Sequence, residues 1–373
     1  MSIFSRCVCC VEPAAGPPSR RLSRRSLLKQ GAAAVGAAAL TAPAASRAAF
    51  AQARIIDARP PAAKPGIIDV HHHLAPPGYV SELARRRLNE PVLERWSPEQ
   101  SIEEMDRAGI ATAVTSITNP GVWFGDDRAA VALARICNDY AARLVADYDG
   151  RFAMFAVLPL PNVDGSLREI EYGLDVLKAD GVCLMTSYGD KWLGDKAFAP
   201  VMDELNRRKA VVYTHPNLPD CCRNLIAEVP RAVIEFQTDT SRTIASLLFS
   251  GTAARCPDIR FIFSHGGGTM PYLIERFVRL PQTNKNAAAA VPDGVATMLG
   301  RFYYDVAQVS NAAAMAALTK VVPKTQIVFG TDYPFRTAAE HLRGLKASGF
   351  SADDLRMIES ENVLALIPRL RAG

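Results

Sequence analysis

The chain contains six histidines, and three of them are consecutive: His71, His72 and His73. They follow a short apolar run, residues 66–70, whose β-branched character is typical of a buried strand. Successive side chains of an extended strand point to opposite faces, so His71 and His73 share a face and His72 points away from it. Two imidazoles on one face of a strand are well placed to bind a single metal ion.

Two of the remaining histidines repeat this pattern. His215 and His265 each end a short apolar run, and each is followed by a residue that stops a strand, Pro or Gly. A further run of the same type ends at a carboxylate, Asp332. Three or four imidazole nitrogens and one carboxylate oxygen suit Zn²⁺ or a similar divalent ion with one position left open.

Strand-like and helix-like runs alternate after residue 65. These runs are the strands and helices that would position the candidate ligands. We predict strands at residues 66–73, 111–118, 152–160, 182–186, 210–215, 260–265, 302–306 and 327–329. We predict intervening helices at residues 97–109, 128–148, 166–179, 198–208 and 240–254. This order, without internal repeats or flexible linkers, predicts an α/β protein that is a single (β/α)8 TIM barrel. No Gly-x-Gly-x-x-Gly turn follows a strand, which disfavours a doubly wound sheet.

A barrel would bring the ends of these strands together over one mouth. The side chains expected there are His71, His73, His215, His265 and Asp332. The fourth strand has no lysine at its end, where residues 184–187 stand, so a carbamylated lysine between two metals is not expected and we predict one ion. Trp123 and Phe124 follow the second strand, where they either contact the ring of a substrate or pack in the core.

Other residues receive structural roles. His72 is predicted to pack behind the site, and His341 lies in a polar helix that we expect to be exposed. Five cysteines follow the first 51 residues, and their odd number and wide spacing describe neither a disulfide framework nor a zinc finger. They are Cys137, Cys183, Cys221, Cys222 and Cys256.

The first 51 residues differ in charge from the rest of the chain. They hold seven Arg or Lys and one acid, which leaves 36 bases and 37 acids in the remainder. The net charge of +5 therefore belongs to this segment, and the near-neutral remainder gives no support to a nucleic-acid partner.

This leader is similar to a twin-arginine export signal. Arg24 and Arg25 precede a mildly apolar stretch, residues 31–40, and a small-x-small site follows. The stretch is about half as long as a membrane-spanning helix. We predict a signal peptide at 1–51, a metal-dependent barrel domain at 52–373, and a periplasmic or secreted mature protein without a stable membrane span.

Four motifs occur in order along residues 66–368: Asp69-x-His71-x-His73, His215-Pro216, His265-Gly266-Gly267-Gly268 and Gly330-Thr331-Asp332-Tyr333-Pro334. Together they resemble the metal-dependent amidohydrolase superfamily (amidohydrolase-related family 2), in its branch with aminocarboxymuconate-semialdehyde decarboxylase. Within that branch, residues 116–122 and 158–161 are most similar to the 6-methylsalicylate decarboxylase group.

The resemblance implies roles for individual residues. It implies that His265 acts as acid or base and that the metal is held by His71, His73, His215 and Asp332. Arg276 falls where the family uses an arginine on the substrate carboxylate, often across a dimer interface, so a homodimer is expected. Ser101 replaces an arginine of the semialdehyde decarboxylase, which favours a substrate with one carboxylate.

The predicted function is metal-dependent decarboxylation of a hydroxylated aromatic (salicylate-type) or similar unsaturated carboxylic acid. Such an acid can chelate Zn²⁺, or Mn²⁺ as the alternative, and protonation of its ring by Asp332 or His265 then lets carbon dioxide leave. The same residues also suit a metal-dependent hydrolase of a lactone or cyclic amide. A metal-binding or transport barrel without turnover is disfavoured, because His265 and Asp332 supply proton-transfer groups that binding alone does not need.

Overall fold

A computed structural model describes residues 66–222 and 225–372. Its main sheet has eight parallel strands in the order β1-β2-β3-β4-β7-β8-β9-β10. Their bounds are β1 (Ile67–His73), β2 (Ile110–Ser116), β3 (Phe152–Val157), β4 (Gly181–Met185), β7 (Val211–His215), β8 (Arg260–Phe263), β9 (Tyr303–Asp305) and β10 (Ile327–Val328). A separate small antiparallel pair is formed by β5 (Ser187–Tyr188) and β6 (Lys191–Trp192). The predicted signal peptide lies outside the described residues.

Hydrogen bonds between the first strand and the segment around the last strand close the sheet into a barrel. The backbone N–H of Val70 donates to the carbonyl of Phe329 (3.0 Å), and the N–H of Asp332 donates to the carbonyl of His71 (2.7 Å). The predicted (β/α)8 TIM barrel is therefore confirmed. Both segments carry predicted metal ligands, so the residues that close the barrel also belong to the predicted metal site.

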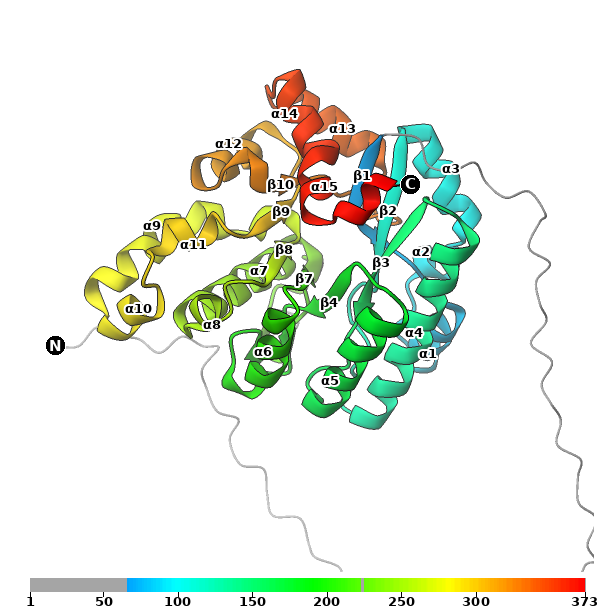
Figure 1. Cartoon of the computed structure of the whole chain (residues 1–373), viewed down its shortest axis with the longest axis horizontal. Helices are drawn as coiled ribbons and strands as arrows, with labels where there is room; N and C mark the ends of the chain where they lie inside the picture. Colours follow the sequence, from blue (N-terminus) through cyan, green and yellow to red (C-terminus); the bar gives the residue numbers. More distant parts are fainter. Residues whose placement is uncertain (1–65, 223–224, 373) are drawn as a thin grey trace, which may run out of the picture. The chain divides into compact units, whose positions relative to one another are not determined.

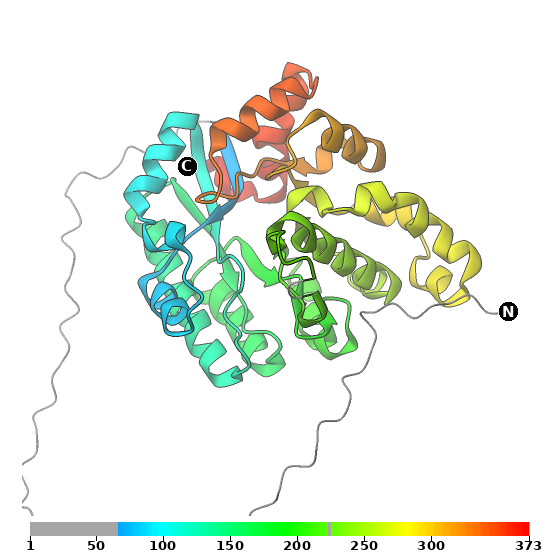
Figure 2. The same cartoon turned by 180° about the vertical axis from the view of Figure 1, so that it is seen from behind.

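Helices surround the strands, as the two opposite views show (Figure 1, Figure 2). Their bounds are α1 (Pro77–Arg85), α2 (Pro91–Glu94), α3 (Pro98–Ala108), α4 (Asp127–Asp147), α5 (Val163–Glu171), α6 (Ala199–Arg207), α7 (Arg231–Phe249), α8 (Thr252–Arg255), α9 (Met270–Thr283), α10 (Lys285–Ala290), α11 (Val295–Leu299), α12 (Ala312–Val321), α13 (Ala338–Ala347), α14 (Ala352–Arg356) and α15 (Asn362–Leu366). Among the residues described, no helix is long and apolar enough to cross a lipid bilayer.

Local signals explain where the helices begin and end. The side chain of Ser97 caps α3 by accepting a hydrogen bond from the N–H of Gln100, and Gly109 ends the helix at φ 74°. The prediction of a helix at 240–254 was wrong at both ends, because α7 begins at Arg231 and stops before Gly251 (φ 79°). β-Branched residues in its first turns weaken the helical signal there.

The barrel strands are buried along almost their whole length. Every residue of β3, β4 and β7 is buried, which is expected for parallel strands covered by helices on one side and barrel packing on the other. All five described cysteines are free thiols, and four of them are buried. The four buried thiols thus pack inside the fold, whereas Cys221 is exposed.

Candidate metal centre

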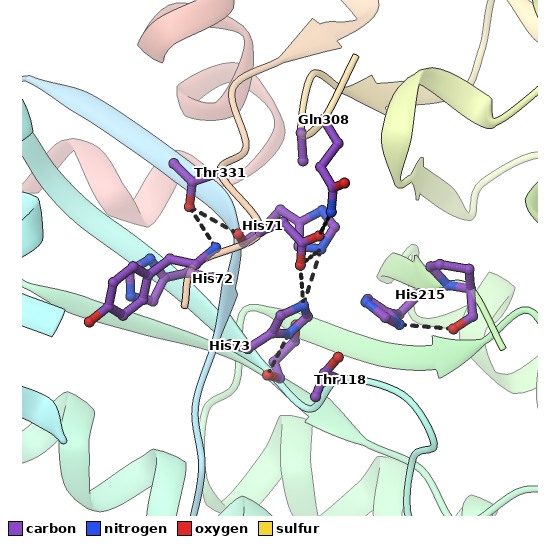
Figure 3. A network of polar contacts seen from close by, with 12 residues as sticks. His71, His72, His73, Thr118, His215, Gln308 and Thr331 are labelled. Carbon is purple, nitrogen blue, oxygen red and sulfur yellow. Dashed lines mark hydrogen bonds and ion pairs between the residues drawn. The ribbon is translucent and has the colours of Figure 1, made fainter. Parts of the chain in front are cut away.

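Four side chains predicted as metal ligands converge at the mouth of the barrel. Figure 3 shows His71, His73 and His215 among them. His71, His73, His215 and Asp332 are all buried, and one ligand atom of each lies within 4.8 Å of the others. Nε2 of His71 lies 3.1 Å from Nε2 of His73. Oδ1 of Asp332 lies 3.2 Å from the first of these nitrogens and 3.0 Å from the second.

An oxygen acceptor beside Nδ1 of each of the three imidazoles favours a proton on Nδ1 and directs Nε2 toward the centre of the cluster. An oxygen acceptor lies beside each Nδ1: Oδ2 of Asp305 for His71 (2.8 Å), the carbonyl of Ser116 for His73 (3.2 Å) and the carbonyl of Pro216 for His215 (3.0 Å). Histidines that ligate metals are oriented in this way by their other ring nitrogen. Three inward nitrogen lone pairs and one carboxylate oxygen fit a divalent cation.

Charge at this centre is dominated by two carboxylates that flank His71. Burial alone would lower the pKa of His71, but the charges of Asp305 and Asp332 raise it to about 10. Burial lowers the pKa of His73 and, more strongly, that of His215. Burial would raise the pKa of Asp332, yet the charge of His71 and hydrogen bonds from the imidazoles hold it well below its usual value. The surroundings therefore favour a positive charge at this point, which a proton on His71 or a divalent ion can supply.

His265 lies beside both Asp332 and the ligand imidazoles, with its ring centroid 5.0 Å from that of His71. Its Nε2 is 3.4 Å from Oδ2 of Asp332, and its buried Nδ1 has no hydrogen-bond partner among the described residues. His265 (φ 54°) and Asp332 (φ 63°) both have left-handed backbone conformations, which are uncommon for residues with a side chain and concentrate at functional sites. Oδ1 of Asp332 thus faces the candidate metal ligands, and Oδ2 faces His265.

Two residues that the sequence analysis did not single out hold this arrangement in place. Asp305, at the end of β9, accepts from Nδ1 of His71 through Oδ2 and from the backbone N–H of His265 through Oδ1 (2.9 Å). Gln308 donates from its side-chain amide to Oδ2 of Asp332 (Figure 3). The sequence does contain a signal for Asp305, because it lies near the carboxyl end of the strand predicted at 302–306. Side chains at that end of a barrel strand lie near the mouth of the barrel. Gln308 lies in a loop, and we find no local signal for it.

The prediction that His72 lies behind the candidate metal ligands is confirmed. Its Nδ1 lies 2.9 Å from Oδ2 of Asp69, and its Nε2 lies 2.5 Å from Oγ of Ser101. Ser101 is buried and thus supports the first strand from behind.

The prediction that His341 is exposed was wrong. Its side chain is buried, because α13 turns this face toward the barrel. Nδ1 donates to the carbonyl of Thr337 (2.9 Å), and Nε2 accepts from the backbone N–H of Gln308 (2.8 Å). His341 therefore supports the loop that presents Gln308 to Asp332.

One cavity opens over the metal centre, and a second adjoins it. The inner cavity has a volume of about 320 Å³, and its lining includes His215, His265, Asp332, Phe236 and Phe335. The outer cavity has a volume of about 740 Å³, and its lining includes Trp123 and Phe124. Phe236 and Phe335, for which no role was predicted, thus share the inner cavity with His215 and Asp332.

Arg276 is not brought to either cavity. It lies exposed on α9 and is absent from the residues that line the inner and outer cavities. A contact between Arg276 and a substrate would therefore need a second copy of the chain, and this role stays a prediction.

Comparisons with known proteins agree with the fold and identify the family. The amidohydrolase family model matches residues 68–369, and the chain belongs to this family. It is 35% identical to decarboxylase yanB of Aspergillus niger over 82% of this chain and 88% of that protein. It is 34% identical to 6-methylsalicylic acid decarboxylase acuB of Aspergillus aculeatus over 82% of this chain and 96% of that protein. The crystal structure of 5-carboxyvanillate decarboxylase LigW from Sphingomonas paucimobilis has the same fold (TM-score 0.72, 20% identity, 82% and 99% covered).

Replacing His71 or His265 tests the division between ligand and acid–base residue. We expect His71→Ala to lose the bound ion, because it removes one of four ligands and leaves two carboxylates facing each other. His265→Ala should keep about one ion per chain, since three imidazoles and the carboxylate remain. Elemental analysis of the purified variants measures this, and a metal-free His265→Ala protein would contradict the assignment.

The raised pKa of His71 predicts that metal binding releases a proton. At any pH below about 10 the metal-free protein holds a proton on His71 that the ion must displace, so metal affinity should rise with pH up to that value. In metal-free protein the same shift stabilises the fold fully below pH ~6.5, and this contribution is lost as pH rises through about 10. Calorimetric titration at pH 7 in two buffers of different ionisation enthalpy should report about one proton released per ion. A release of none would contradict this picture.

Proposed function

We propose that this protein is a metal-dependent carboxy-lyase that removes carbon dioxide from a hydroxylated aromatic acid of the salicylate type. The observation that carries the proposal is the position of Asp332, whose two oxygens face the predicted metal ligands and His265. A metal site joined directly to a proton-transfer pair suits a reaction that must hold an acid and protonate it. Relatives of 34–35% identity that are named decarboxylases support the same chemistry.

The inner cavity suits one aromatic ring. Its volume of about 320 Å³ is at the lower end of the range for ligand pockets. Phe236 lies 6.5 Å from the ring of His215, and Phe335 lies 5.9 Å from the ring of His73, between ring centroids. Flat apolar side chains therefore border the imidazoles, where they can contact the faces or edges of a substrate ring.

The residues divide the chemistry between binding and proton transfer. A divalent ion held by the three imidazoles and Asp332, with zinc proposed and manganese as the alternative, would bind the acid's carboxylate and hydroxyl oxygens and stabilise negative charge. Nε2 of His265 and Oδ2 of Asp332 lie 3.4 Å apart at the cavity wall, where this pair can deliver a proton. Its transfer to the ring carbon that bears the carboxylate allows the bond to that carboxylate to break. The electrons of this bond restore the aromatic ring, and carbon dioxide leaves.

We also propose that the chain is exported and acts as a dimer. The twin-arginine pattern of the first 51 residues supports a periplasmic or secreted enzyme. The exposed position of Arg276 on α9 is compatible with a contact across two copies.

Product analysis separates decarboxylation from hydrolysis. Metal-loaded protein should release carbon dioxide from salicylic acids, lose this activity with a chelator, and regain it on addition of zinc or manganese. His265→Ala should lower kcat by at least about 100-fold, the usual contribution of a general acid, while keeping its metal. Hydrolysis of lactones or cyclic amides without carbon dioxide release would show that the hydrolase interpretation is the right one.

Gln308 offers a test of how Asp332 is positioned. Gln308→Leu removes the amide that donates to Oδ2 of Asp332, and we expect kcat to fall about tenfold while KM and metal content stay near wild type. Gln100→Leu, a change at an exposed glutamine of α3, is the matched control. A rise in KM with unchanged kcat would place Gln308 in substrate binding instead.

A further inference from the structure

The outer cavity is more than twice as large as the inner one and has no part in the chemistry described so far. Its volume is about 740 Å³, against about 320 Å³ for the inner cavity. Glu90, Asn119 and Arg231 line both, so the two cavities meet at these residues. A one-ring acid held at the metal centre would leave the outer cavity to water.

Hydrogen-bonded residues form one wall of the passage between the two cavities. The side-chain amide of Asn119 donates to Oδ1 of Asn217 (2.5 Å), and the amide of Asn217 donates to the carbonyl of Ser187 (3.1 Å). The backbone N–H of Asn217 also donates to Oγ1 of Thr186 (2.9 Å). Because Asn217 follows the predicted ligand His215 by two residues, this wall begins beside the metal centre. A substituent on a bound ring can therefore extend along it.

Aromatic and cationic groups form the wall of the outer cavity near the second strand. Nε1 of Trp123 donates to Oδ1 of Asp127 (2.9 Å), which restricts the indole. The guanidinium of Arg86 lies over the ring of Phe124, 4.2 Å from its centroid. Arg87 also lines this cavity, and its side chain is exposed. An indole held in this way can pack against a second aromatic ring. The guanidinium of an arginine can donate two parallel hydrogen bonds to a carboxylate.

We infer that the substrate is an ortho-hydroxyaryl acid that carries a second, acidic aryl group. The hydroxyaryl acid occupies the inner cavity, and the second ring lies in the outer cavity against Trp123, with its carboxylate near Arg87. This inference rests on the proposed function, because it places the reacting ring at the metal centre. It gives Trp123 and Arg87 a role in substrate choice and none in the chemical step.

The substrate class is tested with salicylic acid and with salicylic acids that bear a phenyl or 4-carboxyphenyl group at each free ring carbon. At least one carboxyphenyl acid should release carbon dioxide with a kcat/KM about tenfold or more above that of salicylic acid, since a second ring adds buried aromatic area. Release from salicylic acid but slower release from every aryl-substituted acid would overturn this inference and leave the proposed function standing. No release from any of these acids would overturn both.

Substitutions in the outer cavity identify where the second ring binds. Trp123→Leu should lower the ratio of kcat/KM for the preferred carboxyphenyl acid to that for salicylic acid by about tenfold. Arg87→Asn should lower the preference for carboxyphenyl over phenyl acids by about fivefold, and asparagine tolerates the left-handed backbone of this residue (φ 58°). Arg128→Asn, at an exposed arginine that lines neither cavity, is the matched control. Equal losses for both acids in Trp123→Leu would contradict the placement of the second ring.

Discussion

A buried cluster of opposite charges at the barrel mouth is the constraint on which the rest of this structure depends. Two carboxylates, Asp305 and Asp332, face imidazoles with almost no exposure to solvent. Burying a carboxylate is costly unless it is paired or hydrogen bonded. All four oxygens have such partners: imidazoles, a backbone N–H or the amide of Gln308. Removal of one member therefore leaves the others uncompensated, and the cluster is stable as a unit.

The same residues complete the fold. β10 has two residues, and the segment that follows it joins the first strand to finish the barrel. The N–H of Asp332 donates to the carbonyl of His71, and the hydroxyl of Thr331 donates to Oδ2 of Asp69 (2.6 Å). Asp332 is therefore positioned in part by the backbone bonds that close the barrel, and Gln308 adds a side-chain hydrogen bond to it.

Chemistry and recognition come from different parts of the chain. Strand ends and the residues directly after them supply the metal ligands and the proton-transfer pair, whereas loops after the first two strands and the first turns of α7 line much of the cavities. Loops can change without disturbing a barrel, and its strand ends converge whatever the loops contain. The strand ends thus carry the candidate metal ligands and the proton-transfer pair, and the loops border much of the space open to a substrate.

The sequence by itself determined the barrel and the four candidate ligands, because hydrophobic periodicity and strand-stopping residues are local signals and barrel geometry then brings strand ends together. Other features depended on which face of an element packs against its neighbours. The burial of His341, the amide of Gln308 beside Asp332, and the position of Trp123 in a separate outer cavity are of this kind. Residues distant in the chain form these contacts, so only the tertiary structure decided them.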